Sequence, residues 1–389
     1  MSKIKEIYLD LCMSGVFHSV LDLPLFTHLS SYVNAVDEGE KIKAYSAMIS
    51  VVYESGVSLT DAVMRSVFED ENVYIKSRAH NREISPQLSE AVRHELLSFE
   101  RLAALTPEDF KADMGLGYVA PFESDCRDFN AEYEKRIADI SKHGYGIFAA
   151  HPMFRLENDG SLSPIVSADK TTVDSFIGYA EERGAVLENT RAFVEGRPAA
   201  NVLLYGDAGT GKSSTVKAVT NAFFDMGIRL IELRKDQLSS LPYVMGRISE
   251  NPLKFIIFID DLSFEKNDDN FSMLKAALEG SASAKAENAV IYATSNRRHI
   301  VRETFDDREG GDVHRNDTMQ EKLSLSERFG FVVLFKKPDK ALYLQIVREL
   351  AERYGIPHDA DLDIRAEEFA LRRGNRSARC AEQFIKSLL

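Results

Sequence analysis

The second half of the chain alternates short apolar runs with segments of helical periodicity. Apolar runs with the length and composition of buried strands begin at residues 201, 228, 254, 289 and 331. Segments with helical spacing of apolar positions lie between them, as over 212–226 and 271–280. This alternation predicts an α/β core over 170–337, built on a five-stranded parallel sheet with helices at its sides. A further helical segment is expected over 338–389.

The first 143 residues have helical periodicity and no recognisable catalytic motif. Ser85 is placed to cap a helix that begins at Pro86, and apolar residues then recur at helical spacing over 88–99. Thr106 followed by proline repeats this pattern. We therefore expect a mostly helical N-terminal domain over 1–143, which would bind a protein partner that the sequence does not identify.

A different pattern separates these two regions. Two β-prone runs flank the turn-forming residues 158–161, whose sequence is Asn-Asp-Gly-Ser. This pattern predicts a β-hairpin over 144–169 that links the helical domain to the α/β domain.

Composition limits the classes of protein to which the chain can belong. Its 389 residues carry a net charge of −13, which argues against binding polyanions over the whole surface, although a local basic face remains open. The three cysteines lack the spacing of a zinc site or a disulfide framework. We see no signal peptide and no apolar stretch of membrane-spanning length, so we expect a soluble, cytoplasmic protein without membrane association.

The loop after the first apolar run has the spacing G-x-x-x-x-G-K-S. In such a loop the glycines let successive backbone N–H groups surround phosphate oxygens, and the following helix presents its positive N-terminus. Lys212 would reach the β- and γ-phosphates of a nucleotide, and the Ser213 hydroxyl would help to hold Mg²⁺. The expected nucleotide-binding residues are Gly206, Asp207, Ala208, Gly209, Thr210, Gly211, Lys212, Ser213 and Ser214.

Polar residues end the third and fourth runs, where parallel strands open into a ligand crevice. Asp260 follows the most apolar run and is expected to hold Mg²⁺, usually through water. Asp261 is a candidate for polarising the attacking water. The fourth run ends in Thr294, Ser295 and Asn296, where a polar side chain could bond the attacking water or the γ-phosphate.

Taken in order, these segments resemble the AAA+ ATPase superfamily over roughly residues 170 to 389. GDAGTGKS is similar to its Walker A motif and FIIFIDD to its Walker B motif. The segments LENTRAF, DDLSFE and LSLSERFG resemble those of a bacterial family of predicted AAA+ ATPases, which is labelled a domain of unknown function because its physiological role is not known. The paired acids and the S-x-R-F motif also resemble the replication-initiator and helicase-loader branch of the AAA+ superfamily.

The resemblance implies ATP and Mg²⁺ as ligands, a helical lid over 338–389 and assembly into homo-oligomers. DSFIGYAEER looks like the segment on the adenine side, with Ile177 and Gly178 near the base. YATSNR looks like sensor 1, which is carried over to Asn296. LSERFG looks like the segment of the arginine finger, carried over to Arg328, which would act on the neighbouring subunit's nucleotide.

Two departures from the superfamily pattern bear on single residues. Asp261 stands where most members have glutamate and is one methylene shorter. The GNRSAR segment is longer than the usual sensor 2 spacing, so sensor 2 is carried over to Arg379 or, as the second choice, to Arg376.

Three functions fit these features. The favoured one is an oligomeric ATPase that uses ATP hydrolysis to load, remodel or switch a macromolecular partner. One alternative is a slow nucleotide-dependent switch or scaffold in which hydrolysis is incidental. The other is a DNA-associated ATPase that contacts phosphates through its C-terminal arginines, which the acidic composition disfavours.

Overall fold

The computed structural model describes residues 2–165, 171–263, 269–278, 286–296, 328–357 and 361–389. The chain divides into two compact units, Met1–Ala150 and His151–Leu389, which are described one at a time. Across these described ranges, no helix combines the length and the apolar character that crossing a membrane requires.

The first unit is helical, as its sequence periodicity predicts. Leu88 N–H donates to the Ser85 hydroxyl at 3.2 Å, so the predicted cap starts the long helix α6. The helices of this unit are α1 (Lys3–Cys12), η1 (His18–Asp22), α2 (Pro24–Val33), α3 (Glu38–Ser55), α4 (Leu59–Phe68), α5 (Val73–Ala79), α6 (Pro86–Ala103), α7 (Pro107–Met114), α8 (Phe129–Ala138), α9 (Ile140–His143) and η2 (Gly146–Phe148).

Aromatic rings and one buried carboxylate organise the core of this unit. Phe17 packs edge-on against Phe99 and Tyr133, with ring centroids 5.7 and 5.5 Å apart. Glu95 on α6 is buried, and its carboxylate accepts hydrogen bonds from the backbone N–H groups of residues 15–17 at 3.0 to 3.2 Å. The fold therefore uses this acid to fix the segment that carries Phe17 into the core.

The second unit is built on a seven-stranded sheet in the order β2-β1-β4-β5-β6-β3-β7. Every neighbouring pair is parallel except β1 and β2. The strands are β1 (Met153–Leu156), β2 (Leu162–Pro164), β3 (Val202–Gly206), β4 (Ile228–Leu233), β5 (Lys254–Ile259), β6 (Ala289–Ser295) and β7 (Phe331–Phe335).

The α/β architecture is as predicted, but the expected count of five strands is wrong. The five predicted strands are present as β3 to β7, and the hairpin adds two more. β1 pairs in parallel with β4, with Phe154 opposite Ile231, so the hairpin extends the sheet. Met153 and Phe154 are fully buried there, and β4 is covered where it would otherwise be an open edge.

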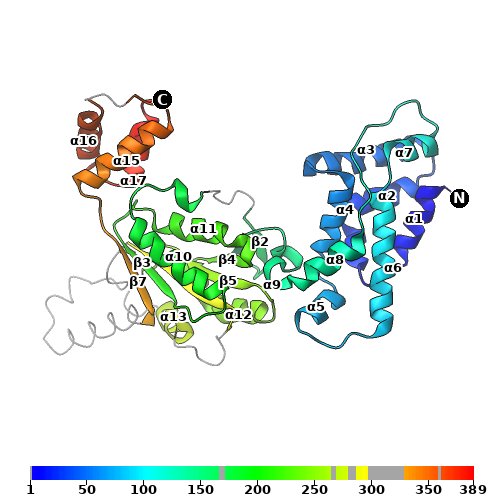
Figure 1. Ribbon diagram of the computed structural model, residues 1–389, viewed down its shortest axis with the longest axis horizontal. Helices are drawn as coiled ribbons and strands as arrows, with labels where there is room; N and C mark the ends of the chain where they lie inside the picture. Colours follow the sequence, from blue (N-terminus) through cyan, green and yellow to red (C-terminus); the bar gives the residue numbers. More distant parts are fainter. Residues whose placement is uncertain (1, 166–170, 264–268, 279–285, 297–327, 358–360) are drawn as a thin grey trace. The chain divides into compact units, whose positions relative to one another are not determined.

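Helices cover the sheet and continue beyond it. α10 and α11 pack with Leu204, Ile256 and Tyr292 on one face of the sheet, and α12 packs against β6 (Figure 1). The helices of this unit are η3 (Val173–Ser175), α10 (Ala180–Val194), α11 (Lys212–Ala222), η4 (Phe224–Met226), η5 (Lys235–Ser240), α12 (Leu241–Ser249), α13 (Asp269–Leu278), α15 (Lys340–Arg353), α16 (Leu362–Arg373) and α17 (Ala378–Lys386).

The last three helices, α15 to α17, form a subdomain with its own core, which we call the lid. Tyr343, Val347 and Phe384 are buried in this core. Ile177, which precedes α10, belongs to the same cluster. The segment before α10 therefore attaches the lid to the sheet.

The end of β3 approaches β7 so closely that it admits no side chain. Gly206 lies opposite Phe335, and a Cβ at Gly206 would come within 2.0 Å of the Phe335 carbonyl oxygen. Its φ of +136° also lies in a region that L-residues avoid. A glycine is therefore required here for β7 to pair with β3.

We expect Gly206→Ala to destabilise the full chain by roughly 2–4 kcal/mol, because the added methyl group collides with backbone and not with a movable side chain. The matched control is Gly184→Ala on α10, where an added Cβ meets nothing within 4 Å. This control should stabilise the helix by about 0.5–1 kcal/mol. Scanning calorimetry should show the two variants shifted in opposite directions, and an unchanged melting profile for Gly206→Ala would contradict the close approach.

Candidate functional site

The glycine-rich loop connects β3 to α11 at the carboxyl edge of the sheet. α11 begins at Lys212, with Gly211 as its N-cap residue, so the first N–H groups of the helix point into the loop. Gly209 has a φ of +77°, and a Cβ there would lie 3.1 Å from the Ser377 hydroxyl of the lid. The loop therefore combines the N-terminus of a helix with close contact to the lid, which is an arrangement suited to phosphate.

Lys212 is almost completely buried in this loop and is held by oxygen atoms. Its Nζ donates to the carbonyl oxygens of Gly206 at 3.0 Å and Asp207 at 2.8 Å, and to Asn296 Oδ1 at 2.9 Å. Burial lowers the pKa of Lys212, and the neighbouring acids oppose that shift. The amine therefore lies inside the loop, where phosphate oxygens could replace its present partners.

The two predicted acids lie beside the loop because β5, β6 and β3 are consecutive in the sheet. Ser213 Oγ donates to Asp260 Oδ1 at 2.6 Å. Asn296 Nδ2 donates to Asp261 Oδ1 at 2.7 Å. The structure thus brings together residues that the sequence placed at three separate strand ends.

Ser213 and Asp260 are the residues that could hold a metal ion. A hydroxyl and a carboxylate fit Mg²⁺, which takes oxygen ligands and is usually bound by few protein groups, with water and substrate phosphates filling its other positions. Over the described part of the chain there is no cluster of three or more histidines, cysteines or acids that would form an all-protein metal site.

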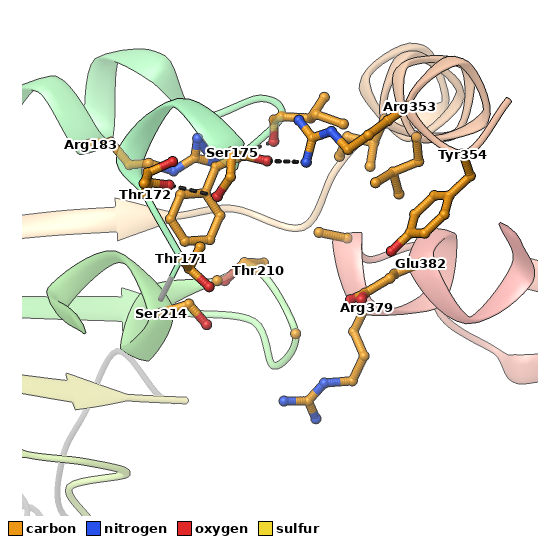
Figure 2. Close-up of a pocket in the computed structure, with 17 residues that line it drawn as sticks. Thr171, Thr172, Ser175, Arg183, Thr210, Ser214, Arg353, Tyr354, Arg379 and Glu382 are labelled. Carbon is orange, nitrogen blue, oxygen red and sulfur yellow. Dashed lines mark hydrogen bonds between the residues drawn. The ribbon is translucent and has the colours of Figure 1, made fainter. Parts of the chain in front are cut away.

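A cavity of about 550 Å³ adjoins the loop and is lined by residues of the loop, of the lid and of the segment before α10 (Figure 2). Figure 2 shows Arg353, Tyr354, Arg379 and Glu382 of the lid on one side and Thr171, Thr172, Ser175 and Arg183 on the other. Among the residues expected at a nucleotide, those that line the cavity are Ile177, Gly209, Thr210, Gly211, Ser214 and Arg379.

The two sensor 2 candidates lie in different surroundings. Arg379 is exposed, lines the cavity, and its backbone N–H approaches the Gly209 carbonyl at 3.4 Å. Arg376 forms a two-pronged ion pair with Glu367, at 3.0 Å from Nε and 2.8 Å from Nη2. The first arginine therefore faces the cavity, while the second is engaged within the lid.

The other predicted residues lie at the margins of the cavity. Gly178 does not line it but packs against the lid, where an added Cβ would come 2.9 Å from Leu342 Cδ1. Asp207 accepts a hydrogen bond from Lys337 N–H at 2.9 Å, and Ala208 is exposed. Arg328 is half-buried before β7 and is not among the cavity residues, and positions 323–327 of its segment fall outside the described ranges.

The cavity also contains residues that the sequence did not single out. Arg183 is buried with its guanidinium 4.6 Å from the centre of the Phe176 ring, and its Nη2 donates to the Ile177 carbonyl at 3.2 Å. Burial lowers the pKa of Arg183 to about 10. Arg353 reaches from the lid to the Ser175 carbonyl at 2.6 Å. No local motif marks these arginines: Arg353 reaches a segment that is distant in the sequence, and Arg183 is held by the residues just before α10.

Comparison with known proteins agrees with this geometry. Residues 149–389 match the family described as "Protein of unknown function (DUF815)". A curated relative, proteasome-activating nucleotidase 2 of Haloferax volcanii, is 27% identical over 224 residues, which cover 52% of this chain and 51% of the relative. The chain thus spans about half the length of that relative.

Two solved structures also resemble the chain. AMPPCP-bound DnaA from Aquifex aeolicus is 16% identical with a TM-score of 0.38, over 56% of this chain and 64% of that one. The RuvB Holliday junction branch migration motor of Thermotoga maritima is 14% identical with a TM-score of 0.33, over 56% and 72%.

The family match covers more than half of the chain, and the nucleotidase relative agrees with the AAA+ resemblance expected from the sequence. The chain therefore belongs to the family described as "Protein of unknown function (DUF815)", and its second unit is a P-loop module of the AAA+ superfamily.

Proposed function

We propose that this chain binds ATP with Mg²⁺ at the glycine-rich loop, hydrolyses it, and uses the ATP cycle as a homo-oligomer to load, remodel or switch a macromolecular partner. The observation that carries the proposal is a series of hydrogen bonds that links Lys212 to Asn296, Asn296 to Asp261, Asp261 to Asp260 and Asp260 to Ser213. Such a group beside a cavity of nucleotide size supports phosphate binding and hydrolysis together.

Binding would use the loop and the two walls of the cavity. The backbone N–H groups after Gly209 and the amine of Lys212 would hold the β- and γ-phosphates. Ser213 and Asp260 would hold Mg²⁺, which neutralises charge on the phosphates. The base would lie toward Ile177 and Gly178, where the segment before α10 meets the lid.

Hydrolysis would rely on groups at the ends of β5 and β6. Asp261 would accept a proton from, or orient, the attacking water, and Asn296 would hold that carboxylate and the water in place. Arg379 would approach the phosphates from the lid, and Arg328 of one subunit would act on the nucleotide of its neighbour.

The macromolecular partner would be a protein that binds the N-terminal helical unit. The curated relative is named as an activator of a proteasome, which supports a protein partner over a small-molecule acceptor. A chain with Asp261→Asn, which should retain ATP without turning it over, is the appropriate bait for this partner. The alternative of a slow switch or scaffold differs from this proposal in the rate of turnover when the partner is present.

Lys212→Ala should weaken ATP binding by about 100-fold or more, because the cation that neutralises the phosphates is lost while the triphosphate keeps its charge. The matched control is Lys217→Ala on the same helix, whose amine lies 3.4 Å from Glu232 and does not line the cavity. This control should bind ATP as the parent chain does. Isothermal titration calorimetry measures both, and equal affinities for the two variants would rule out the loop as the nucleotide site.

Arg379→Ala should weaken ATP binding by roughly 10-fold, the value of one charge-assisted contact. Arg376→Ala should leave ATP affinity within about twofold, because this arginine is already paired with Glu367. The same titration compares the two variants. The reverse order of effects would assign sensor 2 to Arg376.

Arg328→Ala should bind ATP but lose its turnover by about 1,000-fold, which is the contribution of an arginine finger. Lys212→Ala should be inactive for a different reason, since its own site is empty but its finger is intact. Mixing the two inactive chains should restore part of the steady-state phosphate release, and the activity of the parent chain should rise with protein concentration. Full activity of Arg328→Ala, or activity that does not change on dilution, would contradict the arrangement in trans.

A further inference from the structure

Thr294 lies at the point where both predicted acids meet the sheet. It is almost fully buried near the end of β6, and the register that pairs Ile259 with Ala293 makes it the neighbour of Asp260. Its hydroxyl donates to Asp260 Oδ1 at 2.5 Å and accepts a hydrogen bond from Asp261 N–H at 2.9 Å. The Thr294 hydroxyl thus contacts two consecutive acids, Asp260 through its carboxylate and Asp261 through its backbone amide.

The main chain at this point bends in an unusual way. Asp261 has a φ of +53°, in the left-handed region that few residues other than glycine occupy. The next residue is fixed as well, because Leu262 N–H donates to the Thr294 carbonyl at 2.7 Å. Thr294 therefore holds both sides of the bend through its side chain and its backbone.

This bend determines where the carboxylate of Asp261 lies. An aspartate has one methylene fewer than a glutamate, so the reach of its carboxylate depends more on its backbone than on side-chain torsions. The bend directs Asp261 to Asn296, whose Nδ2 donates to Asp261 Oδ1 at 2.7 Å. The backbone geometry that Thr294 maintains is therefore linked to the position of the acid expected to act on water.

Asp260 is oriented by the same hydroxyl. Its Oδ1 accepts from Ser213 Oγ at 2.6 Å, from Thr294 Oγ1 at 2.5 Å and from Asp261 N–H at 3.1 Å. Within the described ranges, no residue donates to the second oxygen, Oδ2. If Ser213 leaves Oδ1 to join a metal ion, the bonds from Thr294 and Asp261 still fix the carboxylate.

We propose that Thr294 is a positioning residue for hydrolysis, whose hydroxyl holds Asp261 in its bent conformation and keeps Asp260 oriented toward the metal position. This inference rests on the proposed ATPase function. Thr294 acts through the two acids that its hydroxyl contacts. Its loss should therefore lower the rate of turnover and leave nucleotide affinity nearly unchanged.

The test compares Thr294→Val, which keeps the shape but removes the hydroxyl, with Thr294→Ser, which keeps the hydroxyl. We expect Thr294→Val to lower kcat by about 10- to 100-fold, as small misplacements of reacting groups do, with the Kd for ATP within about twofold. Thr294→Ser should keep most of the parent rate. The control Thr220→Val removes another fully buried threonine hydroxyl, which donates to the Val216 carbonyl of its own helix, and should keep the parent kcat.

A double variant shows whether Thr294 acts through Asp261. Combined with Asp261→Asn, Thr294→Val should lower the rate by clearly less than the product of the two single losses, because one of the two acids that Thr294 positions is already disabled. Losses that multiply in the double variant, or a parent-like kcat in Thr294→Val, would overturn the inference and leave the ATPase proposal intact. If Thr294→Val does not fold, Thr294→Ala provides a second hydroxyl-free chain for the same measurements. Absence of ATP turnover in the parent chain itself would overturn both.

Discussion

Lys212 is a buried residue, and oxygen atoms at the ends of two neighbouring strands surround its ammonium group. Two of its partners are carbonyls of the loop that follows β3, and the third is the amide oxygen of Asn296 after β6. These bonds require β3 and β6 to be adjacent and the loop to curve around the amine. The sheet order β5-β6-β3 meets this requirement and brings the acids after β5 to the same place.

Hydrogen bonds continue from this lysine through the whole site. Asn296 connects Lys212 to Asp261, Thr294 connects Asp261 to Asp260, and Asp260 returns to Ser213 next to Lys212. The side chains that would hold phosphate and metal are therefore hydrogen-bonded to one another. Nucleotide binding would exchange these internal partners for phosphate and metal, so that one ligand could change the hydrogen bonds of every residue in the network.

The sequence was sufficient to locate the parts of the site that depend on short segments. A strand, a glycine-rich loop and a helix follow one another directly, and Asp260 and Asn296 each end an apolar run. The seven-strand count was not predictable in this way, because the pairing of Phe154 with Ile231 joins segments that are far apart along the chain. The same reason hid Arg353, which bonds to Ser175 across a large separation in the sequence. The hydroxyl of Thr294 was visible as a polar strand end, but its two partners follow from register and from the bend at Asp261.

The most direct test of this account is an experimental structure of the full chain with a non-hydrolysable ATP analogue and Mg²⁺. We expect the amine of Lys212 to leave the carbonyls of Gly206 and Asp207 for the β- and γ-phosphates. Ser213 should exchange Asp260 for the metal ion, while Thr294 still bonds both acids. An analogue bound elsewhere, with Lys212 still on the loop carbonyls, would contradict the claim that this loop is the nucleotide site.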